Sequence, residues 1–278
     1  MFMNLNCGAI QICGLNLSAM VDLARRHGFE GIDPPLDAMP LFNDPDRVAG
    51  LVRDAGLCWG SFGLPVDFHT SDESYQKTFS RLRRSAVVAQ QIGCRRCVTW
   101  IMPCDDDLEY DANFERHAQR LSRAAKLLVD YNIRFGIEFV GPKTLRVTKK
   151  HPFVHTLDQC LVLCDAIGSN CGVLLDSFHW YTSYATEQDI TTKLGDRIVC
   201  VHVNDAMTGR APDQQMDHER ALPCQTAVID LASFVRGLRR IEYDGPVSTE
   251  PMIEVFAGQP ADEVAARVAI AMRKMLVP

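Results

Sequence analysis

Two kinds of segment alternate along the whole sequence, and this alternation restricts the fold more than any other feature. Short runs rich in Val, Ile, Leu and Phe, bounded by Gly, Pro or Asp, give way to longer stretches with apolar residues at helical spacing. Consecutive parallel strands need a crossover helix between them. Eight strand–helix pairs therefore predict an α/β fold with a parallel eight-stranded sheet.

The boundaries of these segments follow from turn and capping residues. We expect strands at residues 4–7, 29–33, 57–62, 97–102, 134–140, 172–176, 198–203 and 247–250. We expect helices at residues 17–27, 44–55, 73–92, 112–131, 156–167, 187–194, 230–240 and 261–275. A glycine directly follows several of these helices, as is typical of helix C-termini.

The length of the chain selects among parallel α/β architectures. Its 278 residues fit one closed (β/α)8 barrel, which takes about 250 residues. An open doubly wound sheet is the alternative, but no predicted strand is followed by G-x-G-x-x-G or G-x-x-x-x-G-K-[ST]. No Gly/Ser linker or low-complexity tract divides the chain. We therefore predict a single TIM-barrel domain over residues 1–278.

Composition excludes several classes of partner and location. The sequence is 47% hydrophobic and 23% charged with a net charge of −6, which is typical of a globular protein and argues against nucleic-acid binding. No apolar run approaches the ~20 residues that span a bilayer, so no membrane partner is expected. Eleven scattered cysteines without a leader argue against a secreted disulfide framework and favour a cytoplasmic protein. The C-x-x-C at Cys94–Cys97 has no second pair to form a zinc knuckle.

Ionisable residues stand at the carboxyl ends of the last four predicted strands. Glu138 lies in G-I-E-F, Asp176 in L-L-D-S-F-H, His202 in V-H-V-N-D and Glu250 in S-T-E-P. Each alone fits a structural role, as a cap, an ion pair or a core histidine. Together at the mouth of a barrel, three carboxylates and an imidazole would need a cation to offset their repulsion. Oxygen-rich ligation with one nitrogen suits Mn²⁺, Mg²⁺ or Co²⁺, with Zn²⁺ as a further candidate.

These segments, in this order, resemble the xylose isomerase-like TIM-barrel superfamily of sugar phosphate isomerases and epimerases. In its ketose 3-epimerase branch, the residues matching Glu138, Asp176, His202 and Glu250 hold one divalent metal, for which Mn²⁺ is our first expectation. The residues matching Glu138 and Glu250 also exchange the proton. The resemblance implies a metal-dependent isomerase or epimerase that removes a proton next to the carbonyl of a small carbohydrate, through an enediolate.

Two histidines and a tryptophan are candidates for the substrate pocket. His179 follows Asp176 by three residues, on the segment leaving the sixth strand, and the resemblance implies that it contacts substrate oxygens; packing beside Trp180 is the alternative. Trp100, at the end of the fourth strand, can form a wall of the sugar pocket or pack in the core. His69, after the third strand, can face the same mouth or belong to an exposed turn.

The long loop after the seventh strand carries a further substrate-binding candidate, Arg220. Related sequences carry an arginine there, and either a substrate or phosphate contact or a surface ion pair fits the residue. Related loops continue with two glycines, but Cys224 and Thr226 occupy those positions here. We therefore expect a turn that relied on positive φ to have changed shape.

Three other functions compete with the isomerase interpretation. A lyase of the inosose or 3-dehydroshikimate dehydratase type begins with the same proton removal and then expels a β-hydroxyl, and no residue separates the two outcomes. An endonuclease IV-like nuclease should carry a His after strand four and a D-x-H pair after strand seven, which are absent. A non-catalytic binding barrel should lack metal ligands, and none is missing. The Met- and aromatic-bearing helices are compatible with a homodimer.

Overall fold

The computed structural model describes residues 1–36, 44–252 and 256–276. The strands of its main sheet are β1 (Phe2–Leu5), β2 (Gly31–Ile32), β3 (Cys58–Trp59), β4 (Phe62–Gly63), β5 (Arg96–Ile101), β7 (Arg134–Phe139), β9 (Cys171–Asp176), β10 (Ile198–Val203) and β11 (Pro246–Thr249). All of these strands pair in parallel, in the order β3-β2-β1-β11-β10-β9-β7-β5-β4. A separate antiparallel pair joins β6 (Cys104–Asp105) to β8 (His151–Pro152).

The two ends of this order close the barrel. β3 is the first strand in this order and β4 is the last, and only Gly60 and Ser61 separate them in the sequence. The two strands therefore occupy one position of the barrel, where the sheet closes. The interruption has a local cause, because the Ser61 amide donates a hydrogen bond to the Asp33 carboxylate (2.8 Å) instead of to a neighbouring strand. Counting β3 and β4 as one position gives the eight predicted positions, and the predicted α/β TIM barrel is confirmed.

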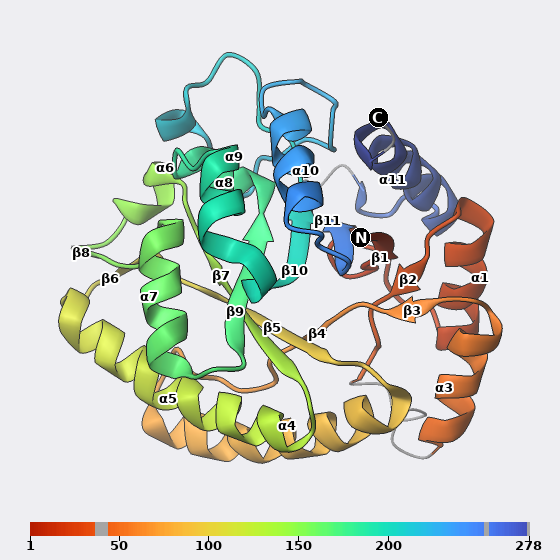
Figure 1. Ribbon diagram of the computed structural model, residues 1–278, viewed down its shortest axis with the longest axis horizontal. Helices are drawn as coiled ribbons and strands as arrows, with labels where there is room; N and C mark the ends of the chain where they lie inside the picture. The colour runs from red at the N-terminus through yellow and green to blue at the C-terminus, as the bar shows by residue number, and fades with distance from the viewer. Residues whose placement is uncertain (37–43, 253–255, 277–278) are drawn as a thin grey trace.

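The helices surround the sheet (Figure 1). The longer ones are α1 (Leu17–His27), α3 (Pro45–Asp54), α4 (Asp72–Ile92), α5 (Tyr110–Asp130), α7 (Leu157–Ile167), α10 (Leu231–Arg240) and α11 (Ala261–Leu276). The shorter ones are α6 (Lys143–Arg146), α8 (Ser177–Thr182) and α9 (Glu187–Asp189). No helix of the described residues is long and apolar enough to cross a bilayer.

Capping residues determine where several of these helices begin and end. The side chains of Asn16 and Ser71 each accept a hydrogen bond from the first turn of the helix that follows. Gly28 and Gly93 end α1 and α4 at φ of 70° and 85°, a conformation that glycine adopts without steric cost. These local signals explain why the predicted bounds of α1 and α4 lie within one residue of the observed ones.

Besides the interrupted third strand and the second strand, which is only Gly31–Ile32, three predicted segments differ from the structure. The first strand lies two residues earlier than expected, because Phe2 and Met3 pair with β11. Residues 187–194 form only one short turn, α9, followed by a π-helix at Ile190–Leu194. This stretch contains β-branched residues, which lose side-chain freedom in a helix. The predicted loop after the sixth strand is helix α8.

Candidate metal centre

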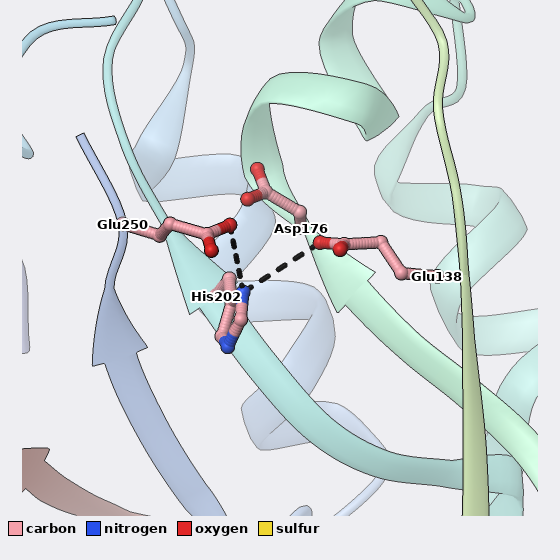
Figure 2. Close-up of side chains that lie close together, drawn as sticks. All are labelled: Glu138, Asp176, His202 and Glu250. Carbon is pink, nitrogen blue, oxygen red and sulfur yellow. Dashed lines mark hydrogen bonds and ion pairs between the residues drawn. The ribbon is translucent and has the colours of Figure 1, made fainter. Parts of the chain in front are cut away.

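The four strand-end residues converge at the mouth of the barrel. Glu138 lies on β7, Asp176 ends β9, His202 lies on β10 and Glu250 follows β11. His202 and Asp176 are register partners, and alternation along each strand puts the four side chains on the inner face. One ligand atom from each residue lies within 4.8 Å of the others, and Figure 2 shows the side chains pointing toward one another.

This donor set fits a divalent cation. Glu138, Asp176 and His202 are buried and Glu250 is partly buried, so their charges are poorly screened by water. Glu138 Oε1 is buried and has no hydrogen-bond partner among the described residues. A buried carboxylate oxygen without a donor is costly unless a cation or ligand reaches it. Three carboxylates are hard ligands of the kind that Mn²⁺ and Mg²⁺ accept, and the imidazole adds one nitrogen ligand.

His202 lies between the two glutamates and separates their pKa values. Its Nδ1 is 3.3 Å from Glu250 Oε2 and 3.6 Å from Glu138 Oε1. Burial alone lowers the pKa of His202, but the two carboxylates raise it well above its usual value. Burial raises the pKa of Glu138 against the opposing effect of His202. Burial acts in the same direction on Glu250, but the positive charges of His202 and Arg220 outweigh it and hold that pKa at about 2.

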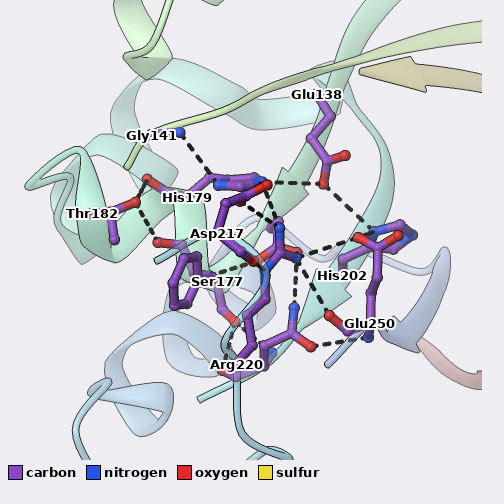
Figure 3. A network of polar contacts seen from close by, with 12 residues as sticks. Glu138, Gly141, Ser177, His179, Thr182, His202, Asp217, Arg220 and Glu250 are labelled. Atoms are coloured by element: carbon purple, nitrogen blue, oxygen red, sulfur yellow. Dashed lines mark hydrogen bonds and ion pairs between the residues drawn. The ribbon is translucent and has the colours of Figure 1, made fainter. Parts of the chain in front are cut away.

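Arg220 is buried beside the cluster and bonded to protein groups, rather than lying on the surface. Its guanidinium is 3.1 Å from Asp176 Oδ2, 3.4 Å from Glu250 Oε2 and 2.8 Å from Asp217 Oδ1. Its Nε donates to the Asp217 carbonyl (2.8 Å), and its Nη2 lies 3.3 Å from His179 Nε2. Figure 3 shows this network. The surface ion pair considered for Arg220 is therefore wrong, since its side chain is 2% exposed.

His179 stands on α8 at the edge of the same network. It is 1% exposed, and its Nδ1 accepts a hydrogen bond from the Gly141 amide (3.3 Å). Its Nε2 lies 4.0 Å from Glu138 Oε1 and 3.9 Å from Asp217 Oδ1. The structure thus brings His179 to the carboxylates of the mouth, where its substrate contact stays a prediction.

Trp100 lies on the open side of the mouth. It is the register partner of Glu138, which puts both side chains on one face of the sheet, and its side chain is 46% exposed. This exposure argues against core packing. The ring of His69 lies 5.3 Å from that of Trp100 and 3.9 Å from that of Phe68, and burial lowers the pKa of His69. His69 therefore joins an aromatic group with Trp100, and a role for either in substrate binding stays a prediction.

Asn204 supports the cluster and was not identified from the sequence. It is fully buried, its Nδ2 donates to Asp176 Oδ2 (2.9 Å), and its Oδ1 accepts from the Glu250 amide (3.0 Å). The residue therefore orients two of the four candidate ligands. Its position two residues after His202, on the same face of the strand, is a signal that could have identified it.

Asp205 holds the long loop that carries Arg220. This buried carboxylate accepts hydrogen bonds from five backbone amides, those of Ala206, Thr226, Ala227, Val228 and Ile229. Cys224 keeps a left-handed backbone (φ 60°) where a glycine is usual. The expected change in the turn is therefore wrong at Cys224, whereas Thr226 is not among the residues with positive φ. Asp205 holds the part of the turn that follows, from Thr226 to Ile229.

We expect Asp205→Ala to lower the free energy of unfolding by about 3 kcal/mol, because five backbone amides, two of them in buried hydrogen bonds, lose their acceptor. Urea denaturation measures this change. The matched control is Asp213→Ala, which removes an exposed ion pair with Lys143 in the same loop and should cost at most about 1 kcal/mol. Equal stability of the two variants would contradict the anchoring role.

Comparison with known proteins finds relatives and solved structures similar to this chain over most of its length. An inosose isomerase of Bacillus velezensis is 24% identical over 244 residues, covering 84% of this chain and 83% of that protein. A 3-dehydroshikimate dehydratase of Pseudomonas putida is 27% identical over 252 residues, covering 86% of this chain and 36% of that protein. The crystal structure of the IOLI protein with a bound zinc atom superimposes with a TM-score of 0.82 at 19% identity, covering 99% of this chain and 98% of that one.

The family itself follows from a match over most of the sequence. The family model described as a xylose isomerase-like TIM barrel matches residues 21–275, which include all four strand-end residues of the mouth. With the barrel and the convergent cluster, this match shows that the chain belongs to the xylose isomerase-like TIM-barrel family.

Proposed function

We propose that this protein is a divalent-metal-dependent isomerase or epimerase that removes and returns a proton next to the carbonyl of a polyhydroxylated substrate. The observation that carries the proposal is the pair of glutamates in one cluster, Glu138 and Glu250, on either side of His202 (Figure 2). Two carboxylates are the groups that such a reaction needs, one to accept the proton and one to return it on the other face.

The environments of the two glutamates suit different roles. The raised pKa of Glu138 brings it closer to neutral pH, where a carboxylate is a more effective proton acceptor. Glu250 is paired with the buried guanidinium of Arg220, which favours its anionic form. Both would also hold the metal, together with Asp176 and His202. A bound divalent cation supplies Lewis-acid stabilisation of the negative charge that develops on the carbonyl oxygen during enediolate formation.

The substrate would be held by the groups around this cluster. His179 would donate to a substrate oxygen, and its contact with the Gly141 amide fixes its ring orientation. Trp100 would cover one face of the carbohydrate with its exposed ring. Arg220 would contact the substrate from within this network. Its ion pairs with Asp176 and Glu250 also orient these two carboxylates.

The metal that we propose is Mn²⁺, because three of the four donor groups are carboxylates, which suit a hard cation. Mg²⁺, Co²⁺ and Zn²⁺ also bind to ligands of these types, and zinc is the ion named for the IOLI structure.

A lyase is the second candidate function, favoured by the similarity to a 3-dehydroshikimate dehydratase. It would use the same proton removal and then expel a β-hydroxyl.

Incubation with inososes, keto-sugars and their phosphates in D₂O tests the proposal. The protein is loaded in turn with Mn²⁺, Mg²⁺, Co²⁺ and Zn²⁺, and NMR follows the hydrogen next to the carbonyl. We expect deuterium incorporation that depends on the metal, with an epimer or isomer as product. A dehydrated product would establish the lyase instead. Metal occupancy well below one equivalent after loading, with no exchange, would overturn both.

A further inference from the structure

The carboxyl group of Asp33 faces the inside of the barrel but has no part in the proposed proton transfer. Asp33 directly follows β2 and is partly buried. Its Oδ1 accepts hydrogen bonds from Asn4 Nδ2 (2.8 Å) and from the Ser61 amide (2.8 Å). No hydrogen bond from the part of the chain that the structure describes reaches its Oδ2. One oxygen is therefore anchored and the other is available.

A polar layer connects Asp33 to the candidate metal centre. Asn4 Nδ2 also donates to Ser248 Oγ (2.8 Å), and Ser248 is the register partner of His202. Glu250, two residues after Ser248, faces inward one step nearer the mouth. Asp33 follows β2 and Glu250 follows β11, and these two strands lie on either side of β1. Two strand spacings put β2 and β11 about 10 Å apart, a separation that a sugar-sized molecule can span.

Two hydrogen-bond acceptors of this layer have no donor among the described residues. Asn4 is 1% exposed, and its Oδ1 has no hydrogen-bond partner in the described residues. Its amide orientation is determined, because the Asp33 carboxylate can only accept and must therefore face Nδ2. Gly60 leaves room for this arrangement, since a Cβ at that position would lie 2.1 Å from Asp33 Oδ1. Two acceptors without donors, Asp33 Oδ2 and Asn4 Oδ1, are complementary to hydroxyl groups.

The same surroundings disfavour an anionic ligand group. No lysine or arginine of the described residues forms an ion pair with Asp33, and residues 37–43, 253–255 and 277–278 contain neither residue type. Arg220 is bonded to Asp176, Asp217 and Glu250. Burial raises the pKa of Asp33 to about 6 against hydrogen bonds from Ser61 and Asn4 and the charge of His202. A substrate carboxylate or phosphate beside it would be repelled.

We propose that Asp33 determines substrate specificity by accepting a hydrogen bond from a hydroxyl remote from the reacting carbon, and that the substrate is an uncharged polyol. This inference rests on the proposed function and narrows its substrate class. It favours an inosose or a free keto-sugar over a carboxylated or phosphorylated compound. A site that binds a hydroxyl through a buried acceptor discriminates strongly against the deoxy analogue, because the acceptor is then left unpaired.

The test compares Asp33→Ala, Asp33→Asn and the control Asp54→Ala with the unaltered protein. Asp54 is an exposed carboxylate at the end of α3, so its loss changes net charge without changing the mouth. All proteins are loaded with Mn²⁺, and kcat/KM is measured for the active polyol, its monodeoxy analogues and a carboxylated analogue. Calorimetry measures Mn²⁺ affinity and polyol binding separately from turnover.

We expect the unaltered protein and Asp54→Ala to lose at least about 100-fold in kcat/KM on one monodeoxy analogue. Asp33→Ala should not distinguish this analogue from the parent polyol, and it should keep its Mn²⁺ affinity. Asp33→Asn retains an oxygen that accepts from Asn4 and Ser61 but removes the negative charge. The ratio of kcat/KM for the polyol to kcat/KM for the carboxylated analogue should therefore fall. If Asp33→Ala does not fold, Asp33→Asn replaces it in the test. Unchanged polyol binding and unchanged deoxy discrimination in both variants would overturn the proposal. If polyol binding depends on Asp33 but no deuterium exchange occurs, the result would count against the proposed reaction and not against the role of Asp33.

Discussion

Glu138→Gln and Glu250→Gln should each lower the rate of metal-dependent solvent-deuterium incorporation by about 10²–10⁴-fold. Glutamine preserves the shape of the side chain and one ligand oxygen but cannot accept a proton. NMR measures the exchange at saturating Mn²⁺, so that weakened metal binding does not enter the result.

The matched control is Glu219→Gln, which alters a glutamate of the Arg220-bearing loop that pairs with Arg210 outside the cluster. We expect this variant to exchange like the unaltered protein. Exchange at the unaltered rate in both Glu138→Gln and Glu250→Gln would refute their assignment as proton-transfer groups. A defect in Glu250→Gln alone would identify Glu250 as the only proton acceptor.

The second large effect is expected in Arg220→Met without metal. Removing this buried cation leaves Asp176, Asp217 and Glu250 close together with no arginine to neutralise them. Breaking a buried ion pair by removing one partner typically costs about 3–5 kcal/mol, and we expect a loss of that size in the free energy of unfolding. Mn²⁺ should restore part of it, because the ion returns positive charge to the same carboxylates.

Urea denaturation with a chelator and with Mn²⁺ measures both parts of this prediction. Arg210→Met is the control, since the Arg210–Glu219 pair is partly exposed and should contribute at most about 1 kcal/mol. Arg220→Lys keeps the charge and should lose less than Arg220→Met. Stability of Arg220→Met equal to that of the unaltered protein in chelator would show that the network contributes nothing.

Much of the fold and the centre of the site could be predicted because both depend on local patterns. The helix that ends at Gly28 is recognisable from nearby residues, since its cap and its apolar spacing lie within one segment. Glu138 and Asp176 could be singled out because a charged residue at the end of an apolar strand is conspicuous without knowledge of its neighbours. Their convergence then followed from parallel pairing, in which the carboxyl ends of strands meet at one edge.

The supporting residues could not be predicted in this way. Asp205 and Asn204 look like ordinary strand-end polar residues, and only their backbone partners show what they hold. Arg220 could equally have been a surface residue, because its burial depends on how the long loop folds back over the mouth. The interruption of the third strand likewise depends on a hydrogen bond from Ser61 to a side chain far from it in the sequence.

The sequence by itself determined the alternation of elements, the barrel and the set of metal-binding candidates, because each depends on residue spacing within a segment. The tertiary structure decided which polar groups meet across the barrel. Asn4 and Ser248, 244 residues apart, are joined by a hydrogen bond only because the first and last strands pair when the sheet closes. Barrel closure thereby places Asp33 inside the mouth, where its free oxygen becomes a candidate for substrate recognition.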